Sequence, residues 1–444
     1  MIYFVDPVLR APTIGCMLMC FAAALVGVIV FLRRQSLLGE TLSHASYPGI
    51  IVGIVASAPF AAKGYEDLPA AIAVIVGAFF SAWLGSCTIE FMKRRLKVHA
   101  DAALCFVLSV FFGVGLTLAS HVQFTHTALY LKMLPFIYGQ PATMTDVHIV
   151  IYALLSLVIV AVVTLLYKEL QAITFDRDYA YSLSINVKVI NAIVLFLIVL
   201  AVIVGIRSVG VVLMSAMLIA PAAAARQWTN KFGTLLVVAS LIGIFSGFFG
   251  NVLSVEGARA LSRGGVYMHL SLPTGPMIVL VAGFICLLSL LFAPQRGLLQ
   301  RWRRALRFRF RCVCENVLKT IWYVGPNSKV SVERIRAREE ISLFYLRFIL
   351  WRLKSAGWLE KVSKRRYRLT EDGHKWAAKI VRLHRLWELY LADVVGVGVE
   401  RVHRSAEEME HIISEEVEDQ LTTMLSNPTS DPHSQPIPPR NVVI

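Results

Sequence analysis

The first 293 residues of this 444-residue chain consist mostly of apolar runs about 20 residues long. A run of about 20 apolar residues is what an α-helix needs to cross the hydrocarbon core of a bilayer. Hydrophobic residues make up 57% of the chain, which exceeds the roughly 45–50% of ordinary soluble proteins. We therefore predict a mainly α-helical protein, with a polytopic membrane region of eight or nine spans followed by a charged soluble region.

Basic clusters between the apolar runs predict the topology. Lys and Arg clusters follow each odd-numbered run, and such clusters stay on the cytoplasmic side of a membrane. The N-terminus is therefore expected outside and the C-terminus inside. The segment 128–139 is short and carries Lys132 and Pro135, so we expect it to be re-entrant or interfacial. The runs lie at residues 13–32, 40–61, 69–91, 101–120, 146–167, 188–206, 208–226, 233–253 and 272–293.

Two ionisable residues enter the second apolar run. Glu40 and His44 stand four residues apart in SLLGETLSHASYPG, so a helix would place them on one face. Ionisable groups at membrane depth are costly and usually face a pathway. One interpretation is that both contact a transported cation. The other is that both lie at the membrane interface and Glu40 caps a helix.

Four motifs occur in a characteristic order: GETLSHASYPG, TFDRDYAYSLSIN, RSVGVVLMSAMLIAPAAAA and HLSLPTGP. Over about residues 10–295 the chain thereby resembles the membrane permeases of the ABC-3 family, which import manganese, zinc or iron. The resemblance implies a transport pathway that includes Glu40, where the family usually has Asp, and His44.

The polar loop 169–186 has a helical pattern in ELQAITFDRDYAYSLSIN. From its residues alone it is either a short helix that docks onto a partner or an ordinary surface loop. The resemblance implies that Phe175 and Asp176 belong to a segment that couples the permease to an ATPase. Ser184 stands where that segment often has Gly.

The same resemblance implies the partners of the membrane region. They are a cytoplasmic ABC ATPase, a metal-binding solute-binding protein outside, and a second permease subunit that is either the same chain or another. The chain contains no Gly-x₄-Gly-Lys-Ser/Thr phosphate loop, the motif that cradles nucleotide phosphates. We therefore expect a permease subunit in the bacterial inner membrane that is not itself an enzyme, with ATP hydrolysed by a separate subunit.

The composition changes after the last apolar run. The stretch PQRGLLQRWRRALRFRFRC holds seven arginines and no acid. Residues 296–313 are therefore predicted to form a basic juxtamembrane linker that anionic membrane lipid attracts. The same segment is a target for a trypsin-like protease, so release of the cytoplasmic part by cleavage is a second hypothesis.

Residues 314–375 have the pattern of a winged helix-turn-helix domain. Its expected parts are a helix at 314–324, a helix and turn at 330–342, a longer helix in the stretch 343–360 that ends at Gly357, and a basic hairpin at 361–373. In such a domain the second helix enters the major groove and the wing contacts the backbone. The aromatic residues Phe344 and Phe348 favour the alternative of a winged domain for protein contacts. The candidate DNA-binding residues are Tyr345, Arg347, Lys364, Arg365 and Arg366.

Imidazoles and carboxylates recur at helical spacing near the C-terminus. Residues three and four apart share one face of a helix, so two packed helices can close these groups around a divalent ion. The set lacks a thiolate, which suits Mn²⁺ or Fe²⁺ and tolerates Zn²⁺. A solvated, acid-rich helix face is the alternative. The residues are His384, Glu388, His403, Glu407, Glu410 and His411.

Together with the ending NPTSDPHSQPIP, these features resemble the iron- and manganese-dependent repressors of the diphtheria-toxin-repressor family over about residues 314–438. The resemblance implies one metal site at the first three of those ligands. It implies a second site at Glu407, Glu410 and His411, with a ligand from the first helix near Asn316. Ser434 replaces a usual Gly. The full order of parts resembles the fused permease–regulators of chlamydiae.

These observations predict a permease that imports a divalent metal and carries a metal-dependent repressor of transcription. In one alternative the tail senses metal and gates transport without binding DNA. In another the protein is a zinc permease with a vestigial tail. The expected parts are a permease domain at 1–295, the linker at 296–313, a winged helix-turn-helix domain at 314–375 and a metal-binding and dimerisation domain at 376–444.

Overall fold

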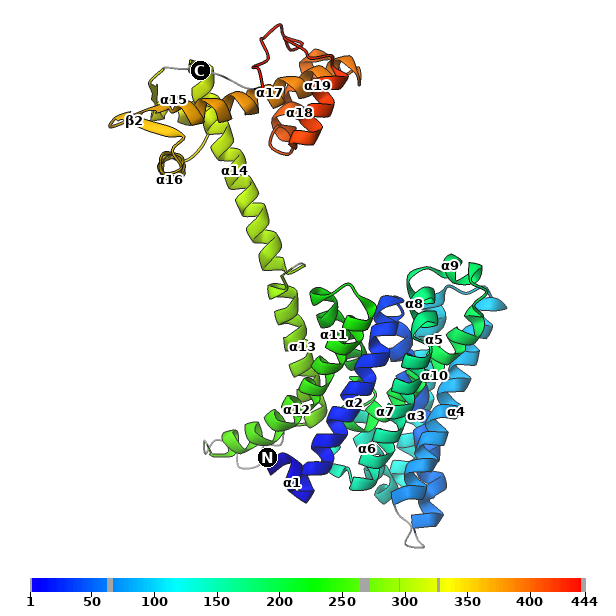
Figure 1. Ribbon diagram of the computed structural model, residues 1–444. Helices are drawn as coiled ribbons and strands as arrows, with labels where there is room; N and C mark the ends of the chain where they lie inside the picture. The colour runs from blue at the N-terminus through cyan, green and yellow to red at the C-terminus, as the bar shows by residue number, and fades with distance from the viewer. Residues whose placement is uncertain (1, 62–66, 264–271, 295, 326–327, 441–444) are drawn as a thin grey trace. The chain divides into compact units, whose positions relative to one another are not determined.

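The chain divides into two compact units, Met1–Gln300 and Arg301–Ile444, each with its own hydrophobic core. The division falls inside the predicted linker. The structure, a computed structural model shown in Figure 1, describes residues 2–61, 67–263, 272–294, 296–325 and 328–440.

Helices dominate the first unit. Among the described residues, seven helices are long and apolar enough to cross a membrane: α2, α4, α5, α7, α10, α12 and α13. The predicted run 40–61 lies in α3, and the run 208–226 begins at the end of α10 and continues in α11, so the polytopic helical class is confirmed and the span count agrees roughly. The helices are α1 (Ile2–Val5), α2 (Pro7–Leu32), α3 (Ser36–Ala61), α4 (Asp67–Arg94), α5 (Ala100–Thr125), α6 (Thr127–Tyr138), α7 (Asp146–Leu165), α8 (Tyr167–Phe175), α9 (Arg177–Ser182), α10 (Val187–Val209), α11 (Met214–Trp228), α12 (Phe232–Arg263) and α13 (Thr274–Phe292).

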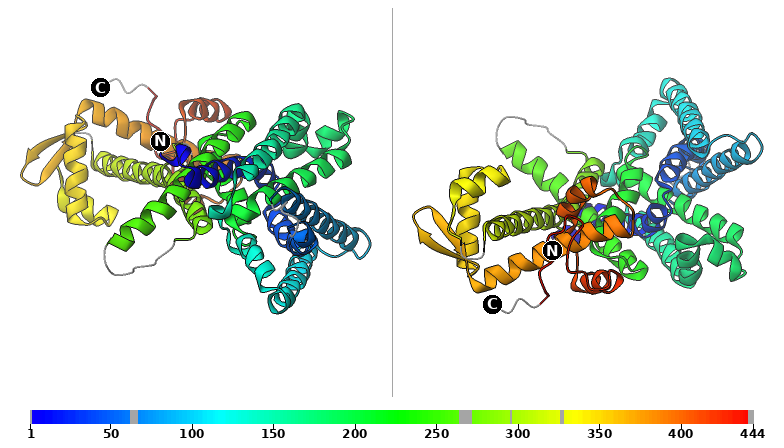
Figure 2. Two further views of the ribbon diagram at one scale, coloured as in Figure 1. Left: turned by 90° about the horizontal axis from the view of Figure 1, so that it is seen from below. Right: turned by 90° about the horizontal axis from the view of Figure 1, so that it is seen from above.

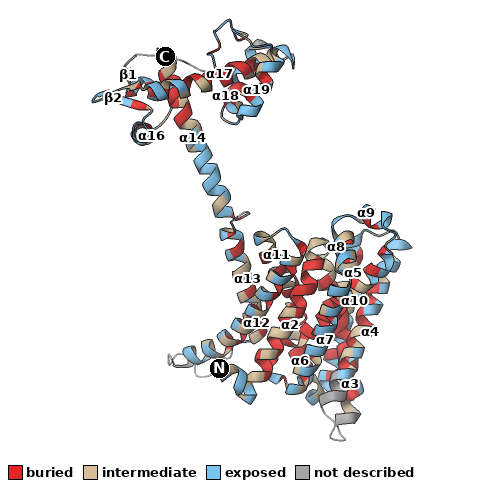
Figure 3. Cartoon of the chain, in the orientation of Figure 1, coloured by how far each residue is buried: buried red, intermediate tan, exposed pale blue. Residues whose placement is uncertain are grey.

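Helix α2 is the central element of this unit. It packs against α7, α10, α11 and α12, and 72% of its apolar window is buried, against 22% for α5 and for α13. Figure 3 shows buried residues along much of its length. A Cβ at Gly27 would lie 1.9 Å from the backbone oxygen of Leu218 on α11. Only glycine permits this approach, which is typical of close helix packing in membranes.

Other helices expose apolar side chains outward. Helix α3 packs along α4 and α5 (Figure 2). The outward faces of α4, α7 and α12 carry large hydrophobic groups. Such a surface fits lipid rather than water. Examples of the exposed side chains are Val76, Phe80, Leu154, Leu157 and Phe245.

The short segment 128–139 is the helix α6. At 12 residues it rises about 18 Å, less than a bilayer core. It ends at Gly139, whose φ of 75° is in the left-handed region, and a Cβ there would meet the backbone of Val209. Of the motif HLSLPTGP, residues 269–271 lie outside the described residues.

The second unit contains a winged helix-turn-helix domain, as predicted. Its three-stranded antiparallel sheet has the order β1-β3-β2. Val317, Leu318 and Ile321 of α14 pack with Leu346 and Ile349 of α16 in one core. The elements are α14 (Leu298–Val324), β1 (Val330–Ser331), α15 (Val332–Glu339), α16 (Leu343–Ser355), β2 (Leu359–Ser363), β3 (Arg366–Leu369), α17 (Glu371–Asp393), α18 (Val399–Met409) and α19 (Glu415–Met424).

Two boundaries differ from the sequence-based expectation. The basic segment 296–313 is not set apart from the helix at 314–324, because residues 298–324 form the single helix α14. Helix α16 ends at Ser355, two residues before the predicted end at Gly357, whose φ of 81° turns the chain into β2. The basic hairpin accordingly spans residues 359–369.

Two serines stand where the resembled families usually have glycine. Ser184 has a φ of 57° and Ser434 a φ of 60°. This left-handed region disfavours residues with a Cβ. Both turns therefore keep the backbone conformation for which glycine is suited.

Residues 429–438 fold back onto α17. Asp431 accepts hydrogen bonds from the backbone N–H groups of His433 (2.9 Å) and Gln435 (2.8 Å). Arg382 donates to the carbonyl oxygen of Pro438 (2.9 Å) and pairs with Glu418 (2.9 Å). These contacts hold α17 in the position from which it presents its polar residues.

Candidate metal centre

Three side chains from two helices meet in the second unit. His384 and Glu388 lie on α17, and His403 lies on α18. His384 Nε2 is 3.1 Å from His403 Nδ1 and 3.2 Å from Glu388 Oε1. His403 Nδ1 is 2.9 Å from the same carboxylate oxygen. The three ligand atoms lie within 4.8 Å of one another.

The burial of these three residues is uneven. His384 and Glu388 are each 2% exposed, whereas the side chain of His403 is 60% exposed. The cluster is therefore fixed from the α17 side and open to solvent from the α18 side. An ion entering from water would meet two preformed ligands and one that can still move.

The other predicted ligands form a second group. Glu410 and His411 are buried where α18 ends, whereas Glu407 is exposed, with its Oε1 3.6 Å from His403 Nε2. His411 Nδ1 lies 2.6 Å from Oε2 of Glu315 on α14. Arg311 Nε donates to the other oxygen of Glu315 at 2.8 Å.

A lysine lies inside the second group. Lys319 Nζ donates to Oε2 of Glu410 at 2.7 Å and to Oε1 at 3.0 Å, and it lies 3.2 Å from Nδ1 of His384. The side chain of Lys319 is 8% exposed and that of Glu410 is 0% exposed. Removing one partner of such a buried pair typically costs about 3–5 kcal/mol.

The pKa values follow from burial and from these contacts. Burial alone would raise the pKa of Glu388, but hydrogen bonds from His384 and His403 outweigh it and lower the pKa to about 2. Burial opposes protonation of His384, but hydrogen bonds with Glu388 and Glu410 outweigh that effect and raise its pKa. Burial would also raise the pKa of Glu410, yet His384 and Lys319 hold it below the usual value.

The two groups differ in how well they suit a metal ion. In the first, two imidazoles and one buried carboxylate present their ligand atoms together, a donor set that suits Mn²⁺, Fe²⁺ or Zn²⁺. In the second, the ammonium group of Lys319 holds both oxygens of Glu410. The first group therefore fits a divalent ion, and the second does not fit one in the arrangement described.

The residue that α14 contributes also differs from the prediction. The side chains of α14 that reach the two groups are Glu315 and Lys319, and none of the described contacts involves Asn316. The predicted ligand Asn316 lies on the same helix, between these two residues. The four-residue spacing of Glu315 and Lys319 on one face was the available signal.

The predicted pathway residues lie on α3 of the first unit. His44 is buried, and its ring packs edge-on against that of Phe112 with centroids 4.5 Å apart. Within the described part of the chain, His44 Nδ1 has no hydrogen-bond partner. Glu40 is half-buried and lies four residues after the start of α3 at Ser36, so it does not cap this helix.

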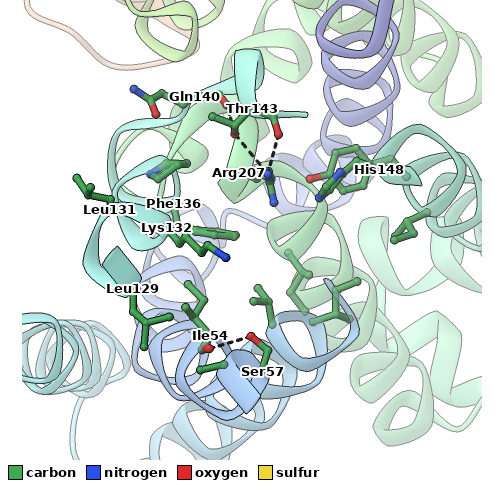
Figure 4. A pocket seen from close by; sticks show the side chains of 17 residues that line it. Ile54, Ser57, Leu129, Leu131, Lys132, Phe136, Gln140, Thr143, His148 and Arg207 are labelled. Atoms are coloured by element: carbon green, nitrogen blue, oxygen red, sulfur yellow. Dashed lines mark hydrogen bonds between the residues drawn. The ribbon is translucent and has the colours of Figure 1, made fainter. Parts of the chain in front are cut away.

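A separate cavity of about 380 Å³ lies among α3, α4, α6, α7 and α10 (Figure 4). Lys132 and Arg207 line it, and Arg207 donates to the carbonyl oxygen of Thr143 at 2.8 Å. None of the described lining residues is acidic, and neither Glu40 nor His44 is among them. This cavity is therefore poorly suited to hold a cation. Lys132, which the sequence analysis placed in a re-entrant or interfacial segment, is one of the two cations that line it.

The predicted coupling residues lie on the surface. Asp176 caps α9 by accepting the backbone N–H groups of Asp178 and Tyr179, both at 3.0 Å. Phe175 ends α8 and is exposed, with its ring edge-on to that of Phe232. Leu183 is exposed close by in sequence. The short helices α8 and α9 thus present aromatic and apolar groups to solvent.

The candidate DNA-binding residues are also exposed. Tyr345 and Arg347 lie on α16, and Lys364, Arg365 and Arg366 lie at the wing. A groove between α15, α16 and the wing is lined by cationic groups, and one of them, Arg365, also pairs with Glu333 at 3.1 Å. The cations of the groove are Arg336, Arg347, Lys361, Lys364 and Arg365.

Comparison with known families assigns both units. The ABC 3 transport family matches residues 5–293. Residues 370–439 match a second family, the metal binding and dimerisation domain of the iron dependent repressors. The predicted resemblances are confirmed by these matches.

Individual proteins agree with the family matches. A probable metal transport system membrane protein of Chlamydia trachomatis is 34% identical over 98% of this chain and 97% of its own length. A manganese transport system membrane protein of Bacillus subtilis is 32% identical over 85% of this chain and 82% of its own length. The structure of PsaBC from Streptococcus pneumoniae in complex with Fab shares the fold, with a TM-score of 0.57 and 22% identity over 68% of this chain and 97% of that one.

A divalent ion at the first group must displace the proton that His384 binds more tightly than usual. The raised pKa of His384 favours its imidazolium form. The ion pairs of this imidazolium are fully present at a pH below the ordinary pKa of histidine, and they are lost as the pH rises through the raised pKa of His384. We therefore expect Mn²⁺ affinity of the full chain to increase with pH across that range, with proton release measured by calorimetry in two buffers. His384→Gln should abolish this binding, whereas His433→Gln, at an exposed histidine, should not. An affinity that does not change between pH 5 and 8 would contradict this assignment.

Proposed function

Because the chain belongs to the ABC 3 transport family, we propose that it is the permease subunit of an ATP-driven importer of Mn²⁺ or Fe²⁺, with Zn²⁺ as a third candidate. Its tail acts as a repressor of transcription that requires the imported ion. The observation that carries this proposal is the cluster of His384, Glu388 and His403 on the same chain as a metal-family permease. The protein lies in the bacterial inner membrane with the tail in the cytoplasm.

The ion passes Glu40 and His44 on its way through the membrane. A buried imidazole whose Nδ1 has no hydrogen-bond partner among the described residues is costly unless a ligand uses it. Glu40 lies one helical turn before His44, so the two offer one carboxylate and one imidazole on one face of α3. A solute-binding protein outside delivers the ion to this face, and a second permease subunit completes the channel.

ATP hydrolysis by a separate ABC ATPase subunit moves the helices. The exposed surface of α8 and α9 supports this contact, because Phe175, Tyr179, Tyr181 and Leu183 are all more than half exposed. Apolar groups of this kind on a polar segment are typical of a docking surface. Asp176 fixes the shape of that surface by capping α9.

The tail binds operator DNA when the first group holds its ion. A metal at His384, Glu388 and His403 would join α18 to α17, and α17 follows directly on the wing through β3. Trp358, just before β2, stacks on Trp376 of α17 with centroids 5.6 Å apart. A change in α17 can therefore reach the winged domain, and pairing of two tails would set the spacing of two recognition helices.

One observation favours a different role for the tail. The recognition helix α16 exposes Phe344, which is 88% exposed, together with Phe348 and Trp351. Large aromatic groups are enriched at protein interfaces, so a tail that gates its own transporter through protein contacts is the second candidate. A zinc permease with a vestigial tail is less well supported, because the first group keeps all of its ligands.

The arginine-rich start of α14 contacts anionic lipid or is cut by a protease. Residues 301–309 are exposed throughout (Figure 3), and Trp302 and Leu306 add an apolar stripe suited to a membrane surface. Proteases bind extended chain, so cleavage requires this part of the helix to unwind first.

An immunoblot of native cells against the tail tests release. A free tail fragment in the soluble fraction is the expected result, and full-length protein confined to the membrane fraction would exclude it.

Uptake measurements test the transport residues. We expect Glu40→Ala and His44→Ala each to reduce uptake of radioactive Mn²⁺ by at least about tenfold, because an ion crossing the bilayer loses a ligand that replaces its water. The complex with the ATPase should still assemble in both variants. His121→Ala, at an exposed histidine of α5, is the matched control. Normal uptake by His44→Ala would place the pathway elsewhere.

A gel-shift titration tests the repressor. With Mn²⁺ present, the solubilised chain should bind its own promoter with an affinity that falls steeply with salt. Combined Lys364→Ala and Arg366→Ala should reduce the slope of log affinity against log salt by about 1.8, at roughly 0.9 for each phosphate that the wing no longer neutralises. Lys375→Ala, outside the wing, should leave the slope unchanged. Absence of any metal-dependent shift would favour the gating role.

A further inference from the structure

We propose that Lys319 is a built-in cation that takes the place of a second metal ion in the tail. The tail then holds one divalent ion, at His384, Glu388 and His403, and its first helix is tied to α17 and α18 without any ion. This inference rests on the proposed metal-sensing function of the tail and goes beyond it by fixing the number of ions and the role of each group.

The position of Lys319 carries the proposal. Its Nζ lies 2.7 and 3.0 Å from the two oxygens of Glu410 and 3.2 Å from Nδ1 of His384. A lysine has three N–H donors and no acceptor, so two of its donors serve one carboxylate. Glu410 thereby has both of its oxygens engaged by an ammonium group, and a metal ion could coordinate them only by displacing it.

The charges in the second group are already balanced. Glu410 is paired with Lys319, and Glu315 is paired with Arg311 at 2.8 Å and contacts His411 at 2.6 Å. Both carboxylates are buried, so water does not screen an added charge there. A divalent ion next to Lys319 would meet the full repulsion of the ammonium group.

The first group has the opposite character. Glu388 is buried, and the partners described for its carboxylate are the imidazoles of His384 and His403. No lysine or arginine contacts it among the described ion pairs. Imidazoles are neutral once they bind a metal, so a divalent ion supplies the positive charge that Glu388 requires. In the second group Lys319 supplies the positive charge beside the buried carboxylate, and in the first group the metal ion would supply it.

Lys319 also connects the two halves of the tail. On α14, its neighbours Val317, Leu318 and Ile321 are part of the core that holds the recognition helix. Thr320 Oγ1 donates to Glu339 of α15 at 2.5 Å. Through Lys319, the same stretch is held to α17 and to the end of α18. Lys319 therefore ties the winged domain to α17 and α18 before metal binds, and the ion adds the link between α17 and His403 of α18, from which a change still reaches the winged domain along α17.

Counting ions on the full chain tests the proposal. The parent is the solubilised chain carrying Glu40→Ala and His44→Ala, which removes the proposed transport ligands. After dialysis against Mn²⁺, elemental analysis should find one ion per chain. Adding His403→Ala should reduce the count to zero, adding Glu410→Gln should leave it at one, and adding Lys319→Glu should raise it to two.

Two ions on the parent, with one lost on adding Glu410→Gln, would overturn the proposal while leaving metal sensing intact. No ion on the parent would overturn the proposed sensing function itself, and this inference with it. The two failures are therefore distinguishable, and neither depends on whether Lys319→Glu folds.

Hydrogen exchange gives a second measurement on the full chain in chelator. Amides of α14 between residues 314 and 321 should be protected without metal, and Lys319→Gln should reduce that protection at least tenfold. Lys329→Gln, a substitution of the same kind outside the cluster, is the control. Protection of these amides in the unmutated chain that develops only when Mn²⁺ is added would contradict the proposal.

Discussion

A carboxylate or imidazole that is removed from water needs an opposite charge or a hydrogen-bond partner beside it. Among the residues that the structure describes, His44 of the first unit is buried with an unmatched Nδ1, and Glu388 of the tail is buried with imidazoles as its described partners. The two sites differ in this respect, because the imidazoles already hydrogen-bond to Glu388 whereas the described residues leave His44 Nδ1 unmatched, and we propose that a divalent cation binds at each. Glu410 meets the same requirement from within the chain through Lys319.

The sequence was sufficient to predict most of the architecture. The spans follow from the length and composition of single helices, and the winged domain follows from local helix, turn and hairpin patterns. The cluster of His384 and Glu388 was predictable because spacing within one helix fixes which side chains share a face. Even the left-handed turns at Ser184 and Ser434 agree with the glycine that the resembled families have there.

The positions that the sequence did not predict depend on contacts between helices. Asn316 was the expected ligand from the first helix, but Glu315 and Lys319 are the side chains of α14 that reach α17 and α18. A shift of one residue rotates a helix face by about 100°, and only tertiary packing fixes that rotation. The same holds for the basic segment, whose helical continuity with residues 314–324 depends on a core formed further along α14.

A single chain that both admits an ion and measures it requires the same kind of cation at two separate sites. X-ray absorption of the Mn²⁺-loaded chain, with the proposed transport residues Glu40 and His44 replaced, tests this most directly because it identifies the atoms around the ion that the tail is proposed to bind. The account predicts a first shell with two imidazole nitrogens and carboxylate oxygen, which His403→Ala removes. A shell of oxygen atoms without imidazole scattering would contradict it.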